Sequence, residues 1–343
     1  MSLSIRKLTH DLEPEWNEYA LKNRASIYHD TRWIQLIKKV FGHDSHHILA
    51  LADGAVVGML PLVQLKSRLF GNYLVSMPYF NYGGVVADDD SVMRALLQSA
   101  SEISRDRRCS HIEMRFDHKL DTDLRVRLEK VTMLLDLPDD PDKLWQAIGS
   151  KRRSQVKRPI REGVEFITGG EELLDEFYTV FSNNMRDLGT PVYSKRFFKE
   201  ILRAFNSESF IAIVRLNGEP VGAGFLLGHQ GKLEIPWAST LRKYNRFGIN
   251  MYMYWNILRV AIEKKYQVFD FGRSSKDAGT LKFKKQWGAE QKQLYWYYDI
   301  KEGGPLPGLN PSNKKYQAAI SAWKKMPVNL TRIIGPHIVK NLP

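Results

Sequence analysis

The sequence predicts an α/β (α+β) fold in which one supersecondary unit is used twice in tandem. Two segments show the same pattern: an apolar run, a two-residue turn and a second apolar run. The first, HHILALADGAVVGMLPLVQL at 46–65, turns at Asp53–Gly54, and the second, FIAIVRLNGEPVGAGFLLG at 210–228, turns at Asn217–Gly218. Asp-Gly and Asn-Gly between apolar runs are strong signals for a tight β-hairpin. Each half of the chain is therefore expected to carry a hairpin of the same design.

The same order of elements follows each hairpin: a further strand, a loop, a helical stretch and a closing strand. Corresponding positions in the two halves lie about 160 residues apart, which indicates an internal duplication. Strands joined through a crossover helix predict mixed sheets flanked by helices. The segments are LVSMPYF (74–80), 91–105 and HIEMRF (111–116) in the first half, and LEIPWAS (233–239), 250–265 and VFDFG (268–272) in the second.

Prolines and acidic residues at 137–141 indicate the junction between the halves. We expect an N-terminal domain at 1–138, a C-terminal domain at 139–300 and a basic, partly helical tail at 301–343. In the tail, Tyr316, Ile320 and Trp323 form an apolar stripe among lysines. The stripe predicts a helix that packs on the second domain, or alternatively a basic amphipathic helix lying on an anionic membrane. We favour the first.

The charge balance points to an anionic partner. The 343 residues include 51 Lys and Arg against 38 Asp and Glu, a net charge of +13. Such an excess favours nucleic acid, a phosphorylated substrate or an anionic membrane surface. The single cysteine, Cys109, excludes an intramolecular disulfide, and no apolar run reaches the roughly 20 residues that span a bilayer. No signal-peptide pattern opens the chain, so a cytoplasmic location is expected.

Common catalytic motifs are missing from the sequence. It contains no GxSxG, HExxH, Walker or CxxC pattern, and no GxGxxG after a strand. His46 and His47 would point to opposite faces of one strand, so we expect no metal site. The chemistry should therefore need neither a metal nor a covalent nucleophile.

Two basic segments are candidate anion or donor sites. The loop LRKYNRFGIN at 241–250 follows a strand and precedes a helix, whose free N–H groups favour an anion. It is similar to the pyrophosphate loop of GNAT acyltransferases, although it lacks the second small residue of their RxxGxG/A pattern. The second segment, KRRSQVKRPIR at 151–161, is either a solvated face or a surface for a nucleic-acid backbone. The candidate residues are Arg242, Arg246 and Gly248 in the loop, and Arg152, Arg153 and Lys157 in the second segment.

A third segment, NMRDLGTPVYSKRF at 184–197, ends a helix with Gly189 as its C-cap. Arg186 either pairs with Asp187 or is presented to a ligand together with Thr190 and Tyr193.

The stretch FDFGRSSKDAGTLKFKKQWGAE at 269–290 leads from a buried strand into a lysine cluster. Together with MRDLGTPVYSKRFF (185–198), WAST (237–240) and the helix start Asn250…Tyr254–Trp255, it makes the chain resemble FemAB-type proteins, over about residues 1–300. The resemblance is to the branch associated with PEP-CTERM/exosortase systems. It implies two GNAT-like domains, that is, a tandem duplication of a GNAT-like acyltransferase fold.

The resemblance also implies an activity. Well-understood FemAB-type members transfer an amino acid from aminoacyl-tRNA to the amino group of a peptidoglycan precursor. Phe283–Lys284…Trp287–Gly288 is similar to their FK..FG motif, whose lysine contacts the anionic substrate near the reacting centre. The chain lacks the long helical arm of some members, which excludes tRNA handling by that arm. For this branch the setting points to cell-envelope or exopolysaccharide precursors, with no particular donor or acceptor implied.

Direct transfer needs positioning, a donor to the oxyanion and a route for the proton. We expect Lys284, with Arg273 and Ser274, to neutralise phosphate or oxyanion charge in a cleft of the second domain. Asp270 and Asp187 are candidate proton acceptors, although Asp270 can instead fix a loop. The expected substrate-binding residues are Arg186, Thr190, Tyr193, Trp237, Asn250, Tyr254, Arg273, Ser274, Phe283 and Trp287.

The expected function is acyl or aminoacyl transfer to an amine or hydroxyl, without a tightly bound cofactor. The donor is aminoacyl-tRNA or acyl-CoA, and the expected partners are an anionic small molecule or polymer precursor, with tRNA and an anionic membrane as further candidates. Two alternatives stay open: an acyl-CoA-dependent N-acyltransferase, and a non-enzymatic protein that binds polyanions or membrane surfaces.

Overall fold

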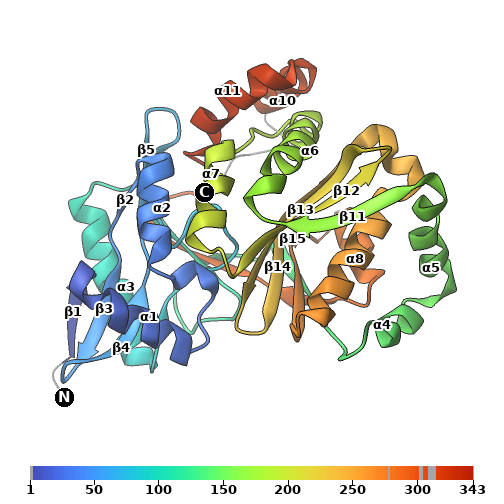
Figure 1. The fold of residues 1–343 in the computed structure, drawn as a ribbon. Coiled ribbons are helices and arrows are strands. Elements are labelled where there is room, and N and C mark those ends of the chain that lie inside the picture. The colour runs from blue at the N-terminus through green and yellow to red at the C-terminus, as the bar shows by residue number, and fades with distance from the viewer. Residues whose placement is uncertain (1–2, 277–278, 301–303, 308–313, 343) are drawn as a thin grey trace. The chain divides into compact units, whose positions relative to one another are not determined.

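The computed structural model describes residues 3–276, 279–300, 304–307 and 314–342, without the side chains of 314–316 (Figure 1). Its contacts divide the described chain into two compact units. Unit 1 holds described residues within 3–130, 293–307 and 340–342, and unit 2 holds those within 131–292 and 314–339.

Unit 1 contains two sheets and three α-helices. The helices are α1 (Glu13–Lys22), α2 (Arg32–Phe41) and α3 (Asp90–Asp106), with short 3₁₀ turns η1 (His10–Leu12) and η2 (Ile27–His29). The four-stranded sheet has the order β1 (Leu3–Lys7), β3 (Ile48–Ala52), β4 (Ala55–Leu60) and β7 (Val86–Ala87). The six-stranded sheet has the order β2 (Asp44–Ser45), β5 (Val63–Ser67), β6 (Gly71–Val75), β8 (His111–Phe116), β17 (Tyr295–Ile300) and β9 (Arg125–Arg127).

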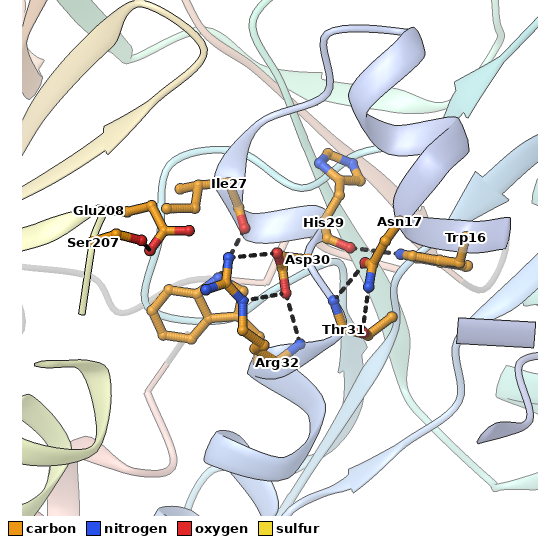
Figure 2. Close-up of polar contacts among 10 residues, drawn as sticks. Trp16, Asn17, Ile27, His29, Asp30, Thr31, Arg32, Ser207 and Glu208 are labelled. Carbon is orange, nitrogen blue, oxygen red and sulfur yellow. Dashed lines mark hydrogen bonds and ion pairs between the residues drawn. The ribbon is translucent and has the colours of Figure 1, made fainter. Parts of the chain in front are cut away.

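Polar contacts join α1 to the start of α2 within unit 1 (Figure 2). The buried indole N–H of Trp16 donates to the His29 carbonyl at 2.6 Å. Asn17 exchanges two hydrogen bonds with Thr31, one to its hydroxyl at 2.8 Å and one from its backbone N–H at 3.1 Å. Arg32 pairs with Asp30 at 2.8 Å. The Arg32 backbone N–H also donates to Asp30 at 2.9 Å, which satisfies a donor of the first turn of α2, whose N-cap Thr31 makes no side-chain cap bond.

Unit 2 is built on one seven-stranded sheet. Its order is β11 (Val164–Gly169), β12 (Ser209–Leu216), β13 (Glu219–His229), β14 (Lys232–Thr240), β15 (Val268–Ser275), β10 (Lys130–Asp136) and β16 (Glu290–Gln293). Pairing from β11 to β14 is antiparallel, and β14 and β15 are parallel. The remaining elements are α4 (Pro141–Ala147), α5 (Gly149–Lys157), η3 (Pro159–Glu162), η4 (Glu171–Leu173), α6 (Leu174–Leu188), α7 (Lys195–Ala204), η5 (Arg242–Phe247), α8 (Ile249–Glu263), α9 (Gly279–Lys285), α10 (Lys314–Lys325) and α11 (Val328–Val339).

Helices α6 and α8 cover opposite faces of the unit 2 sheet. In β13, Phe225 packs against Phe177 of α6, with ring centroids 5.5 Å apart. The neighbouring Gly224 faces Ile257 of α8 so closely that an added Cβ would lie 3.3 Å from its Cδ1. Successive residues of a strand point to opposite faces, so these contacts place the two helices on the two sides.

The predicted hairpins and mixed sheets are confirmed. Asp53 and Gly54 have φ of 48° and 87°, and Asn217 and Gly218 have φ of 53° and 77°. Positive φ at both turn residues is the type I′ geometry that matches the twist of a hairpin. Each unit then has a parallel pair joined through a helix, β6–α3–β8 in unit 1 and β14–α8–β15 in unit 2.

The two units do not follow simple intervals of sequence. Strand β10, which lies within the expected N-terminal domain 1–138, is between β15 and β16 in the unit 2 sheet. Strand β17, within the expected domain 139–300, pairs with β8 and β9 of unit 1. Pairing between strands so distant in sequence leaves no local signal, which is why the boundary at 138 did not anticipate it.

The tail packs on α6 of unit 2. Arg332 of α11 donates to the Ser182 hydroxyl at 2.9 Å, and Arg186 donates to the Met326 carbonyl at 3.0 Å. Trp323 of α10 is buried, whereas the side chain of Tyr316 is outside the described residues. Packing on the second unit, the favoured expectation for the tail, is therefore what the structure shows. Among the described helices, none has the length and apolarity to cross a membrane.

Close backbone packing of α11 gives a stability prediction. A Cβ added to Gly335 would lie 2.8 Å from the backbone nitrogen of Val192. Gly335→Ala should lower the free energy of unfolding by about 1–3 kcal/mol, the usual cost of overpacking. Urea unfolding checks this, with Ser321→Ala on the exposed part of α10 as the control. Equal stability of the two variants would contradict the docked position of α11.

Candidate active site

The parallel strands of unit 2 separate where the candidate site begins. Strands β14 and β15 pair at Lys232–Val268, Leu233–Phe269 and Glu234–Asp270, although they continue to Thr240 and Ser275. Pro236 has no N–H to donate to a ladder, and the β13–β14 register shifts beside it, between Phe225 and Leu227. The sheet therefore opens at the carboxyl ends of two parallel strands, the usual position of a site in an α/β sheet.

Two buried carboxylates lie at the last residue pair before the opening. Glu234 is 3% exposed and Asp270 is fully buried. Asp270 Oδ1 accepts from the Thr132 hydroxyl at 2.7 Å and from the Gly272 N–H at 2.8 Å, and Lys232 Nζ lies 3.7 Å from Oδ2. Asp270 thus fixes the backbone at Gly272 within β15, and fixing the chain locally is one of the two roles considered for it.

Lys284 is buried beside Gly272. Its ammonium group donates to the carbonyls of Gly272 at 2.7 Å and of Arg273 at 3.0 Å. Burial lowers the pKa of Lys284 to about 8, against the opposing attraction of Asp270 and Glu234. Among the described residues these bonds use two of its three N–H donors. A buried ammonium group of this kind can hold an anion or release a proton near neutral pH.

The aromatic residues on either side of Lys284 in the sequence, Phe283 and Trp287, belong to a cluster of rings. Tyr254 of α8 stacks on Phe271 with centroids 5.5 Å apart, and Phe283 meets Tyr254 edge-on at 5.1 Å. Phe283 also contacts Trp287 at 6.3 Å. Burial raises the pKa of the Tyr254 hydroxyl. These contacts bring together Tyr254, Phe283 and Trp287 among the expected residues, and Lys284 itself is 7% exposed.

A cavity of about 390 Å³ lies at the N-terminus of α8. Gly248 caps this helix with φ +81°, and an added Cβ would lie 3.2 Å from the Gln155 carbonyl oxygen of α5. A side chain at this position would therefore be strained as well as crowded. Arg242 is exposed and does not line the cavity. The lining residues are Gln155, Arg158, Thr240, Asn245, Arg246, Gly248, Asn250, Met251, Phe283 and Gln286.

The cations of α5 have different environments. Arg153 donates to the carbonyls of Trp145 and Gln146, both at 3.2 Å, and Lys157 lies 5.7 Å from the Trp145 ring. Arg152 lines a second cavity. The basic segment therefore does not present one continuous face of free cations.

The residues expected after α6 belong to another cluster. Arg186 pairs with Asp187 at 2.7 Å, which is the structural alternative considered for it. Tyr193 and Trp237 lie 6.1 Å apart in an aromatic cluster with Phe197 and Phe198 of α7. Thr190 is exposed just after the helix.

Arg273 and Ser274 occupy the edge of the opening. Arg273 is exposed, whereas Ser274 is buried and accepts a long hydrogen bond from Thr280 at 3.4 Å.

Sequence reasoning missed Glu234, Thr132 and Gln286. A carboxylate inside the apolar run LEIPW was an available signal for Glu234. Thr132 carried none, because its strand reaches Asp270 from far along the chain.

The equivalent region of unit 1 differs in charge: a cavity of about 250 Å³ lies at the start of α3, and Asp88, Asp89, Asp90 and Asp121 are among its lining residues. Within β8, Arg115 donates to Glu113 at 2.6 Å in a buried ion pair and also donates to the Phe80 carbonyl. Tyr298 donates to the same glutamate at 2.8 Å. The N-terminus of α3 is capped by Asp89, whose carboxylate accepts from Ser91 and Val92. An anion is therefore disfavoured there, and unit 2 is the better candidate.

In comparison with known proteins, a family model matches a segment that lies within unit 2. Residues 150–285 match the acetyltransferase (GNAT) domain family. The crystal structure of FemX superimposes with a TM-score of 0.66 at 16% identity, over 86% of this chain and 97% of FemX. The fold is a tandem pair of GNAT-like domains. A tandem GNAT protein from the clavulanic acid biosynthesis pathway is also similar, with a TM-score of 0.57 at 12% identity, over 89% of this chain and 100% of that one.

Two further proteins are similar to this chain. It is 27% identical over 116 residues to the UDP-N-acetylmuramoylpentapeptide-lysine N(6)-alanyltransferase of Weissella viridescens, over 33% of this chain and 34% of that protein. The match thus spans about a third of the relative. The C-terminal domain of a putative lysylphosphatidylglycerol synthetase from Agrobacterium fabrum has a TM-score of 0.56 at 12% identity, over 92% of this chain and 95% of that one. The FemAB-type resemblance is thereby supported at the level of FemX-like GNAT proteins.

Burial of Lys284 predicts a pH-dependent stability. Its pKa is about 8 in the folded protein and near 10.5 when unfolded, so the unfolded chain binds more protons between these values and stability rises with pH there. The full effect is at most about 3 kcal/mol. Unfolding in urea at pH 7.5 and pH 10 should show wild type gaining stability relative to Lys284→Met. Parallel pH profiles would contradict the buried ammonium group.

Proposed function

We propose that the protein transfers an acyl or aminoacyl group directly to an amine or hydroxyl at the opening of the unit 2 sheet. The observation that carries the proposal is buried Lys284 beside Asp270, where β14 and β15 separate. The general class, a transferase, is supported by the GNAT fold and by the alanyltransferase similarity. The donor, the acceptor and the residue roles are our proposal.

The anionic part of the donor would occupy the cavity at the start of α8. Free N–H groups at a helix N-terminus and the adjacent positive dipole favour phosphate. Arg246 and Arg158 line this cavity and supply positive charge, and Asn250 supplies an amide. Phe283 lines the same cavity one residue before Lys284, so the anion site and the lysine share helix α9.

The reaction would proceed without a covalent enzyme intermediate. The acceptor nitrogen or oxygen forms a bond to the donor's carbonyl carbon, and the carbonyl oxygen becomes an oxyanion. The carbon–oxygen or carbon–sulfur bond to the donor then breaks, and the nucleophile's proton passes by way of a base to the departing group. Protonated Lys284 would donate its third N–H to the oxyanion or to a phosphate. Arg273 and Ser274, at the edge of the opening, would contact the same anion.

Asp270 and Asp187 remain our candidates for the base. Asp270 already accepts two hydrogen bonds, and Asp187 pairs with Arg186. Of the two, Asp270 is next to the Gly272 turn that Lys284 contacts, and we prefer it for that reason.

Aminoacyl-tRNA is our preferred donor, and acyl-CoA is the alternative. The similarity to an alanyltransferase supports the first, and the match to an acetyltransferase domain supports the second. Either donor would place phosphates near a chain of net charge +13.

For the acceptor we propose a cell-envelope or exopolysaccharide precursor, as expected for the PEP-CTERM/exosortase-associated branch. The support is the set of sequence stretches that carry that resemblance. The tail offers a peripheral contact at the inner face of an anionic membrane, since α11 exposes Leu330 and Ile333 and α10 exposes Lys324 and Lys325. An exosortase or polysaccharide gene cluster beside the gene would favour this acceptor, and a peptidoglycan cluster would oppose it.

Removing the lysine tests the transfer reaction. Lys284→Ala should reduce the transfer rate by at least about 100-fold, as loss of an oxyanion donor does. The control is Lys282→Ala, an exposed lysine of the same helix, which should leave the rate nearly unchanged. Consumption of aminoacyl-tRNA and acyl-CoA is measured for both variants. If neither donor is consumed by wild type and Lys284→Ala only weakens salt-sensitive polyanion binding, the non-enzymatic alternative replaces our proposal.

Coenzyme A separates the two donors. If acyl-CoA is used, millimolar coenzyme A should raise the Tm, because a ligand that binds only the folded state stabilises it. Arg246→Ala should reduce that rise, whereas Arg203→Ala, an exposed arginine of α7, should not. No rise in the wild-type Tm would count against acyl-CoA and leave aminoacyl-tRNA.

A further inference from the structure

A second cavity of unit 2, with a volume of about 680 Å³, is not used by the proposed reaction. Its walls come from the end of β10 and the segment after it, from α4, and from the turn between α9 and β16. Most of the lining is apolar and largely aliphatic. The apolar residues are Leu135, Leu137, Pro138, Leu144, Ala147, Ile148 and Trp287.

Cationic side chains surround this apolar interior. Lys143, Arg152 and Lys285 line the cavity, with Asp136 as the one acid among the lining residues. Lys143 is paired with exposed Asp139 at 2.6 Å. Within the part of the chain that the structure describes, no carboxylate forms an ion pair with Arg152 or Lys285. The cavity therefore combines an apolar interior with a positive edge.

The cavity adjoins the candidate active site. Gln286 lines both this cavity and the one at the start of α8. Helix α9 contributes Phe283 to the cavity at the start of α8 and Lys285 to the second cavity. Helix α5 likewise contributes Gln155 to the cavity at the start of α8 and Arg152 to the second cavity. The two cavities therefore share one lining residue and are both bounded by α5 and α9.

We propose that this second cavity binds a single-chain anionic amphiphile, an alkyl or acyl chain that ends in a phosphate or carboxylate. The volume is within the range of ligand sites, roughly 300–1,000 Å³. Burial of the chain against aliphatic walls supplies affinity, and Arg152 and Lys285 select a negative end. A nucleobase fits less well, because Trp287, the one aromatic lining residue, is 2% exposed and offers little surface for stacking.

The inference rests on the proposed function in one respect: it would give one of the two substrates, or its carrier, an apolar chain. Occupancy can nevertheless be measured without turnover. Dodecyl phosphate below its micellar concentration is the probe, followed by titration calorimetry on the full chain. Inorganic phosphate tests the anion alone, and dodecyltrimethylammonium tests the chain with the opposite charge.

A steric variant tests the location. Ala147 is exposed at the end of α4, so Ala147→Trp should fill the cavity without disturbing the core. It should weaken dodecyl phosphate binding at least about tenfold, or 1.4 kcal/mol. Ala318→Trp, an exposed position on α10, is the matched control and should bind as wild type does.

A charge variant tests the selectivity. Lys285→Gln should weaken the binding of dodecyl phosphate several-fold, and Lys282→Gln, on the same helix but outside the lining, should not. Equal binding by the Ala147→Trp and Ala318→Trp variants, or equal affinity for the cationic amphiphile, would overturn the inference. These binding measurements do not depend on the transfer assay. A wild-type protein that consumes neither donor would contradict the proposed function and leave the amphiphile site untouched.

Discussion

Everything in the candidate site depends on the separation of β14 from β15 after Glu234 and Asp270. Parallel strands that pair along their full length leave no space between them for a ligand. Here Pro236 removes a ladder donor and the neighbouring register shift bends β14 away. Beside the opening lies Gly272, a buried residue of β15 with φ 70°, whose backbone N–H donates to Asp270. Lys284 then donates to two backbone carbonyls, those of Gly272 and Arg273, which fix the position of its ammonium group.

Burying charge in this region is costly, and the chain limits the cost by grouping opposite charges. Lys284 is accompanied by Asp270 and Glu234, and Lys232 lies near Asp270. Their attraction does not outweigh desolvation, so the pKa of Lys284 is still lowered to about 8. With a pKa of about 8, the Lys284 ammonium group is protonated at neutral pH and loses its proton only slightly above it. Such a group suits the neutralisation of a short-lived oxyanion.

The two units share a fold but carry different side chains beside their parallel strands and at the start of the crossover helix. In unit 1, Glu113 and Arg115 of β8 and Tyr298 of β17 form a buried polar group joined by hydrogen bonds. Its helix N-terminus is occupied by Asp89, whereas that of α8 follows Gly248 and adjoins arginine. The same backbone plan therefore carries an acidic cap at the helix start in one unit and arginine beside it in the other, which is why we place the proposed anion site in unit 2.

The sequence by itself determined the duplicated α/β plan and both tight hairpins, because turn residues and apolar periodicity act over short distances. Lys284 stays a prediction that rests on the family resemblance. The sequence also indicated the loop before α8. Only the tertiary structure decided that β10 and β17 join the sheets of units that their sequence positions did not suggest, that Thr132 supports Asp270, and that Arg186 and Trp237 serve packing around α6 and α7. Those outcomes depend on hydrogen bonds and contacts between residues more than 100 positions apart, or on which face of a strand a side chain occupies. Such pairings are selected by the whole packed core, and no short stretch of sequence specifies them.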